Sequence, residues 1–190
     1  MALLPTTEYV AHETDIPGLL FFDVNYVGDD RGYFQEKYQK AELVAAGMPE
    51  SFNVVQNSLS YNKQAGVTRG LHAEPWDKYI TIVKGRVFAA YVDLRAGPSF
   101  GKLVTTEITP TSAVFLPQGV ANSFQTLEPD TYYLYSVNKH WSAEDYAKYK
   151  FVNLADTTLD IHWPISLDKA VVSDRDRNHP PLENVKPMEL

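Results

Sequence analysis

The chain contains no cysteine, which excludes disulfide bonds, thiolate chemistry and cysteine-ligated zinc. It also lacks any run close to the roughly 18 consecutive apolar residues that a membrane-spanning helix needs. The first residues, Met1–Glu13, have neither the cationic segment nor the continuous apolar segment of a signal peptide. We therefore expect a cytoplasmic protein without a membrane partner.

Positively charged residues are fewer than negatively charged residues. There are 17 Lys and Arg residues against 24 Asp and Glu residues, which gives a net charge of −7. Binding a nucleic-acid polymer needs a basic face, so we expect no nucleic-acid partner. A small phosphorylated ligand needs only a few cations gathered locally, and the candidates for that gathering are Arg31, Arg69, Lys78 and Arg175.

Histidine is also scarce, and its spacing argues against a metal centre. The five histidines are His12, His72, His140, His162 and His179. A metal site on a small β-barrel typically combines two or three imidazoles with a carboxylate. No two histidines here stand at such a spacing, and His72 is followed by Glu74 rather than by a second histidine. We expect no metal, and we find no cofactor motif, so the chemistry left to the chain is proton transfer.

The length of 190 residues and the apolar fraction of 44% fit one globular domain spanning residues 1–190. Short β-forming segments follow one another from Phe52 onward, separated by turns such as Gly97-Pro98 and Pro129-Asp130. Many short strands without alternating helices indicate a β-sandwich or barrel. We therefore predict an all-β fold, a cupin-like jelly roll with short peripheral helices.

Three local predictions follow from the same pattern. The segment Gln39–Ala46, closed by Gly47, is predicted to be a short helix. Lys78–Val83 and Arg86–Leu94, joined at Lys84-Gly85, are predicted to form a hairpin whose second strand is buried on both faces. The Pro-rich end, about residues 177–190, is predicted to be an extended tail that is ordered only if it packs on the barrel or on another subunit.

The stretch Thr68–Tyr79 carries the main candidate for chemistry. His72 is a natural acid/base group because imidazole titrates near neutral pH. A histidine that acts as a base needs a carboxylate to fix its tautomer, and the sequence leaves four candidates open: Glu74, Asp77, Asp93 and Asp176. Lys78 and one tyrosine could stabilise an enolate and return the proton.

Five motifs occur in order between about Gly18 and Val185. They are G-D-D-R-G-Y-F-Q-E (28–36), G-V-T-R-G-L-H (66–72), Y-V-D-L-R (91–95), F-L-P-Q-G-V-A-N-S-F (115–124) and S-D-R-D (173–176). Together they resemble the dTDP-4-dehydrorhamnose 3,5-epimerase family. The residues around Glu74 and Asn122 are similar to those of a subgroup of this family found in some Gram-positive bacteria. The resemblance implies a metal-free, cupin-like and usually dimeric isomerase that acts on dTDP-4-keto-6-deoxy-hexose in dTDP-L-rhamnose synthesis.

The resemblance also implies roles for individual residues. His72 matches the family's base, Asp176 its carboxylate partner, Tyr135 the proton donor and Lys78 the lysine near the sugar carbonyl. The residues that match nucleotide-binding and sugar-binding positions are Arg31, Glu36, Gln56, Asn57, Arg69 and Arg175.

The chain departs from the family pattern at two places. Asn122 stands where a second histidine is usual, and an asparagine can donate a hydrogen bond but cannot carry a charge. Trp141 replaces a tyrosine and could offer an aromatic face to thymine. These departures keep three alternatives open: a single-site epimerase, a 3,4-ketoisomerase, and a cupin that binds a sugar nucleotide without catalysis.

Overall fold

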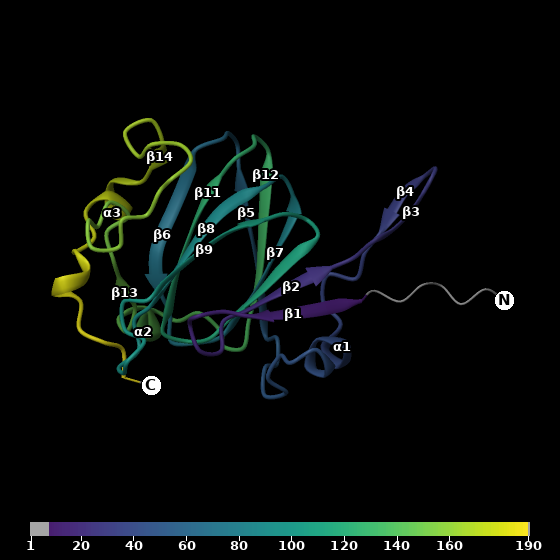
Figure 1. The fold of residues 1–190 in the computed structure, drawn as a ribbon, viewed down its shortest axis with the longest axis horizontal. Helices are drawn as coiled ribbons and strands as arrows, with labels where there is room; N and C mark the ends of the chain where they lie inside the picture. The colour runs from purple at the N-terminus through teal and green to yellow at the C-terminus, as the bar shows by residue number, and fades with distance from the viewer. Residues whose placement is uncertain (1–7, 190) are drawn as a thin grey trace.

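A computed structural model of the chain describes residues 8–189, so both ends of the predicted 1–190 domain, residues 1–7 and 190, lie outside the described residues. Two antiparallel sheets face one another, and short helices lie at the periphery (Figure 1). This is the predicted mostly-β sandwich with short peripheral helices. No helix in this part of the chain is long and apolar enough to cross a membrane.

Each sheet is assembled from strands that are distant in sequence. The first sheet contains, in spatial order, β1 (Tyr9–Glu13), β2 (Leu20–Val24), β10 (Ser112–Leu116), β7 (Lys78–Lys84), β12 (Thr131–Val137) and β5 (Gln56–Asn62). The second contains β13 (Lys150–Phe151), β6 (Val67–Ala73), β11 (Val120–Thr126), β8 (Val87–Asp93) and β9 (Leu103–Ile108), while β14 (Val171–Val172) pairs in parallel with β6. The order places β6 beside β11 in one sheet and β7 beside β12 in the other.

The predicted hairpin at Lys84-Gly85 is wrong. β7 pairs with β10 and β12 in the first sheet, whereas β8 pairs with β11 and β9 in the second. The turn therefore carries the chain across the sandwich, with Gly85 at a φ of +91° close to Thr131. Both strands are buried on two faces, and such a pattern does not distinguish strands that pair from strands that face each other. The predicted burial of β8 is confirmed.

Apolar layers on both sides of each sheet explain this burial. Ile80, Tyr91 and Phe124 belong to the core between the sheets. The outer face of the first sheet is covered by α1 (Lys40–Ala45) and the segment after it. The helix prediction is confirmed, because Gln39 caps the start of α1 and Gly47, with a φ of +119°, follows its end.

The C-terminal segment covers the outer face of the second sheet. It contains α2 (Ala143–Tyr146), α3 (Asp174–Arg177) and the 3-10 turn η1 (Leu182–Asn184). Leu182 and Met188 are buried against this sheet, and Met188 N–H donates to Leu94 O (2.7 Å). The described part of the predicted tail is thus packed on the body of the molecule, and it contains the turn η1 rather than being extended throughout.

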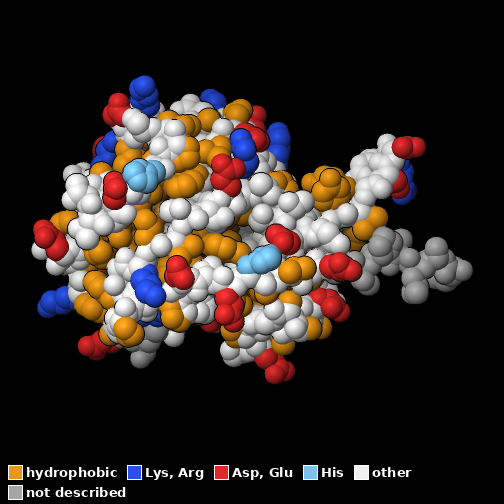
Figure 2. Space-filling view, viewed as in Figure 1, with side chains coloured by type: hydrophobic (Ala, Val, Ile, Leu, Met, Phe, Trp, Pro, Cys, Tyr) orange, Lys and Arg blue, Asp and Glu red, His pale blue; other side chains and the backbone are white. Residues whose placement is uncertain are grey.

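One element stands apart from the sandwich. Within residues 8–189, the strands β3 (Val27–Asp29) and β4 (Gly32–Phe34) pair only with each other and form a projecting hairpin, here called the arm (Figure 1). Figure 2 shows hydrophobic side chains near the base of the arm and charged side chains at its tip. Tyr33 and Phe34 are 58% and 69% exposed, which is unusual for large apolar groups.

Candidate active site

A cavity of about 240 Å³ opens between the two sheets, and all four predicted catalytic residues line it. We call it the His72 pocket. Its lining residues are Ser60, Arg69, His72, Glu74, Lys78, Asn122, Phe124, Tyr133, Tyr135 and Asp176. The connection between β6 and β7 makes this possible, since it carries the chain from the second sheet, which holds His72, to the first sheet, which holds Lys78 and, on β12, Tyr135.

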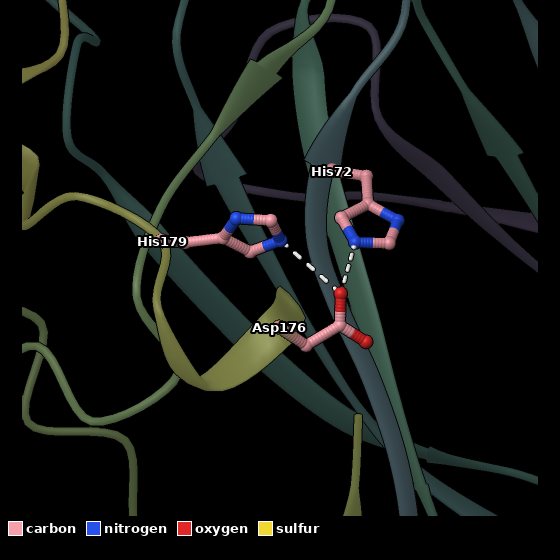
Figure 3. Close-up of side chains that lie close together, drawn as sticks. All are labelled: His72, Asp176 and His179. Atoms are coloured by element: carbon pink, nitrogen blue, oxygen red, sulfur yellow. Dashed lines mark hydrogen bonds and ion pairs between the residues drawn. The ribbon is translucent and has the colours of Figure 1, made fainter. Parts of the chain in front are cut away.

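His72 lies on β6, where it is flanked by Asn122 on β11 and Phe151 on β13. Its Nε2 is 2.8 Å from Asp176 Oδ1 (Figure 3). A carboxylate only accepts hydrogen bonds, so His72 donates its Nε2–H to Asp176. The other ring nitrogen, Nδ1, then carries the lone pair of a base, and it points away from Asp176. Among the four open candidates, Asp176 is therefore the carboxylate that contacts His72.

Asp176 is held by the short helix α3, whose first turn is capped by Ser173. Burial works against the charge of this carboxylate, but the hydrogen bonds from His72, His179 and Ser173 outweigh it and lower the pKa of Asp176. The carboxylate is thus ionised at neutral pH and can stabilise an imidazolium at His72.

His179 is a neighbour that the sequence did not reveal. Its Nε2 is 3.1 Å from the same Asp176 Oδ1, and the residue is 8% exposed (Figure 3). It follows Asp176 by three residues and lies just beyond the C-cap of α3, Asn178. That spacing was available in the sequence, but it acquires meaning only once Asp176 is known to contact His72.

The opposite wall carries the predicted electrophile and proton donor. Lys78 Nζ is 2.6 Å from Glu74 Oε1 and donates to Asn122 Oδ1 (3.1 Å). Asn122 was expected to act as a hydrogen-bond donor, and its Oδ1 also accepts a hydrogen bond from Lys78. The Lys78 ammonium also lies 5.4 Å from the centre of the Tyr135 ring.

Tyr135 is suited to donate a proton. Burial raises the pKa of its hydroxyl; a side-chain hydrogen bond with Ser58 lowers it, and the nearby Glu74 charge raises it further. The net effect is a raised pKa, which keeps the phenol protonated at neutral pH. Because Tyr133 shares a face of β12 with Tyr135, its ring also lines the pocket, stacked on Phe124.

The predicted binding residues are distributed around this pocket unevenly. Arg69 lines it, with its Nε donating to Asn62 Oδ1 (3.1 Å). Gln56 lies on the edge strand β5, where its Oε1 accepts from the backbone N–H of Trp141 (3.0 Å). Trp141 is exposed beside it.

Asn57 is not brought together with these residues. It follows Gln56 on β5, so the two side chains point to opposite faces of the sheet, and Asn57 donates to Ser136 Oγ (3.2 Å). Ser58 and Ser60, which share the Gln56 face, are the β5 residues that reach Tyr135 and the pocket lining. Sequence reasoning missed both serines, although the alternation of the strand could have indicated them.

Three further predicted residues lie outside the pocket lining of this chain. Arg31 is at the tip of the arm, paired with Asp29. Glu36 lies at the base of the arm, where its backbone carbonyl accepts from the Tyr9 hydroxyl (2.6 Å). Arg175 is exposed on α3, and its guanidinium lies 4.9 Å from the rings of both Tyr146 and Phe151.

Within residues 8–189, one group of side chains has the composition of a metal site. The ligand atoms of His72, Asp176 and His179 all lie within 4.8 Å of one another. Both imidazoles, however, approach the same carboxylate oxygen at hydrogen-bond distance. That geometry satisfies all three groups as a hydrogen-bonded set of two imidazoles and a carboxylate.

Comparison with known proteins agrees with this geometry. The sequence profile of the family described as dTDP-4-dehydrorhamnose 3,5-epimerase matches residues 13–184. The chain belongs to this family. A Streptococcus pyogenes serotype M6 protein named as an RmlC homolog is 47% identical over 178 residues, which cover 92% of this chain and 89% of that protein.

Further relatives support the membership. The dTDP-4-dehydrorhamnose 3,5-epimerase of Shigella flexneri is 32% identical over 174 residues, covering 87% of this chain and 92% of its own length. The structure of RmlC from Streptococcus suis, solved in complex with dTDP-D-xylose, is 46% identical with a TM-score of 0.89 and covers 94% of both chains. The epimerase family and its cupin-like fold, both expected from the five motifs, are thereby confirmed.

Proposed function

We propose that the chain epimerises dTDP-4-dehydro-6-deoxy-D-glucose at C3 and C5 to give dTDP-4-dehydro-L-rhamnose, a step of dTDP-L-rhamnose synthesis. The observation that carries the proposal is the position of the acid/base groups. His72, bonded to Asp176, extends from the second sheet, while Lys78 and Tyr135 extend from the first sheet into the same cavity. A sugar ring bound between the sheets has a base on one face and a proton donor on the other.

Proton transfer across the ring accounts for the inversion. His72 Nδ1 removes the proton from the carbon next to the C4 carbonyl, and the electron pair moves onto the carbonyl oxygen as an enolate. The Lys78 ammonium stabilises this oxyanion. Tyr135 then returns a proton to the opposite face of the carbon, which inverts it. His72 releases its proton to solvent and Tyr135 regains one, so the enzyme is restored without any redox change.

The substrate is held by residues around the pocket mouth. Arg69 and Gln56 would bind the phosphates and the sugar, Asn122 would orient the sugar through Lys78, and the exposed Trp141 ring would stack on thymine. Arg175 would add positive charge beside Asp176. Support for a dTDP-sugar comes from the Streptococcus suis relative, whose structure holds dTDP-D-xylose.

We further propose a homodimer in which the arm completes the partner's pocket. Arg31 and Glu36 match nucleotide-binding positions of the family, yet the arm carries Arg31 away from the sandwich of its own chain (Figure 1). The exposed rings of Tyr33 and Phe34 offer apolar area for such an exchange. Arg31 and Glu36 would then reach the substrate of the second subunit.

The deciding experiment is solvent deuterium uptake into dTDP-4-dehydro-6-deoxy-D-glucose, followed by mass spectrometry and proton NMR. Deuterium at both C3 and C5, with the L-lyxo product trapped by a reductase, is the expected result. The His72→Ala variant serves as the control that should give no label. Because Asn122 replaces a histidine of the family, the second candidate function is a single-site epimerase, which would label one carbon only.

Absence of label would contradict both epimerase assignments. A changed product without label would identify a 3,4-ketoisomerase that moves its proton internally. An unchanged sugar that still binds would identify a non-catalytic cupin.

A further inference from the structure

Asp176 accepts hydrogen bonds from two imidazoles at one oxygen. His72 Nε2 lies 2.8 Å and His179 Nε2 lies 3.1 Å from Asp176 Oδ1 (Figure 3). An ionised carboxylate oxygen offers about two lone-pair directions, and an ionised carboxylate has no proton to donate. Each imidazole therefore contributes an N–H, and together they use the full acceptor capacity of Oδ1.

The ring of His179 is fixed by its surroundings. It stacks on Phe151 with ring centres 4.6 Å apart and an interplanar angle of 16°, and Phe151 meets the His72 ring edge-on at 5.4 Å. The backbone around it is also held, since Asn153 Nδ2 donates to His179 O (2.9 Å) and Asn153 N–H donates to Pro180 O (2.8 Å). His179 is thus a rigid donor aimed at Asp176.

We propose that His179 is a positioning residue that holds the Asp176 carboxylate in line with His72, so that His72 keeps its proton on Nε2 and presents Nδ1 to the substrate. The inference rests on the proposed role of His72 as the base. A carboxylate is free to turn about its terminal torsion, for which no staggered position is strongly preferred. A second fixed donor on Oδ1 removes that freedom.

The charge state of His179 suits this role. The charged and titratable groups that act on it are His72 on β6 and Asp176 and Arg175 on α3. Burial lowers the pKa of His179, and the charges of His72 and Arg175 lower it further against the opposing effect of Asp176. A neutral His179 donates to Asp176 without adding a second positive charge beside the imidazolium that forms at His72.

Two substitutions at this position separate positioning from packing. In His179→Gln the side-chain amide retains an N–H donor but cannot titrate, while in His179→Phe the ring stacked on Phe151 is retained without a donor. For His179→Phe we expect kcat to fall about 10- to 100-fold with KM within about 2-fold of the wild-type value, as for other groups that orient a functional imidazole. For His179→Gln we expect kcat within about 3-fold of wild type, because the donor is restored.

A measurement without substrate keeps this inference separate from the proposed function. The imidazole N–H protons bonded to Asp176 should give downfield proton NMR signals, assigned with His72→Ala and His179→Gln. In His179→Phe the His179 signal should vanish and the His72 signal should shift or broaden, while in His179→Gln the His72 signal should stay in place. This result would hold for the hydrogen-bond network even if wild-type protein took up no deuterium, which would reject the epimerase function alone.

The inference is overturned by either of two results. One is a His179→Phe protein whose His72 signal and kcat match the wild type. The other is an equal loss of kcat in both variants that follows an equal loss of thermal stability, since that pattern indicates a packing role only.

Discussion

In the His72 pocket the Asp176 carboxylate is buried, whereas the charged groups of the arm are exposed. In the pocket the Asp176 side chain is 9% exposed and contacts two histidines, whereas at the arm tip the Arg31 side chain is 89% exposed and paired with Asp29. Proton transfer depends on groups held in fixed geometry, and burial with full hydrogen bonding provides this. A group that serves a second subunit can acquire its fixed geometry on association. Under the proposed function, one chain would carry the acid/base pair of its own pocket, and its arm would serve the binding site of the second subunit.

Loss of His72 should give the largest effect on the pocket side. His72→Ala removes the base, so we expect kcat/KM to fall about 10³- to 10⁴-fold with the fold and dTDP binding retained. The exposed His12, bonded to Asp23 on the outer strands, provides the matched control, and His12→Ala should retain activity. Steady-state kinetics with circular dichroism measures both. A fully active His72→Ala protein would reject the mechanism.

One glycine on β6 and one in the arm allow the destabilisation caused by an added side chain to be compared between the two regions. Gly70 on β6 and Gly32 in the arm have φ values of +130° and +133°, so alanine is strained at both. A Cβ on Gly70 would lie 2.2 Å from Ser123 Cβ, whereas a Cβ on Gly32 meets nothing within 4 Å. We expect Gly70→Ala to lower the free energy of unfolding by about 3 kcal/mol more than Gly32→Ala in urea titrations. Equal losses would show that the pocket sheet can relax as freely as the arm.

Removal of the arm cation should affect binding more than chemistry. We expect Arg31→Ala to raise KM about 10-fold, the typical value of a lost charge-assisted hydrogen bond, with kcat within about 2-fold. Mixing Arg31→Ala with inactive His72→Ala protein tests the shared site, because a heterodimer regains one intact pocket. Low-KM activity should then reappear after subunit exchange. If mixing restores nothing, the arm does not serve the partner's pocket.

The smallest expected effect is on the pH dependence of stability. Burial opposes ionisation of Asp176, but its hydrogen bonds lower its pKa below the ordinary value of 3.8. Its stabilising contribution is therefore present above that ordinary value and is lost as the pH falls through the lowered pKa. Wild-type protein should lose more free energy of unfolding in this acid range than Asp176→Asn does.

Asp29 in the arm is the control for this measurement. Its pKa is also lowered, by the hydrogen bonds from Arg31, but it is solvent-exposed and its pairing is screened. Asp29→Asn should leave the acid limb of the stability curve close to that of wild type. Parallel curves for wild type and Asp176→Asn would contradict the assigned pKa shift.

Much of the fold could be predicted because it depends on local patterns. Many short β-forming segments separated by turn residues indicated a β-sandwich, and Gln39–Gly47 contained the capping residues of α1. The pairing of β7 and β8 was wrong for a physical reason, since two consecutive strands with both faces buried fit a hairpin or a crossing equally well. The apolar layers that cover each sheet determine which of these two arrangements forms.

The residues of the candidate site also divide into those that the sequence identified and those that only the fold revealed. His72, Lys78 and Tyr135 were identifiable from residue type and motif. The family resemblance also implied Asp176, but residue types alone left it as one of four candidate partners, and the fold places it 2.8 Å from His72. His179 had no motif of its own, and strand alternation places Asn57 on the face opposite to Gln56.

By itself, the sequence determined the family, the mostly-β class and the chemical groups available for proton transfer, because these depend on composition, short-range pattern and motif order. Only the tertiary structure decided which sheet carries each group, which carboxylate contacts His72, and that Arg31 is carried away from the pocket on the arm. These are contacts between residues far apart in the chain. They are set by how the apolar faces of the two sheets are covered, and no local pattern encodes them.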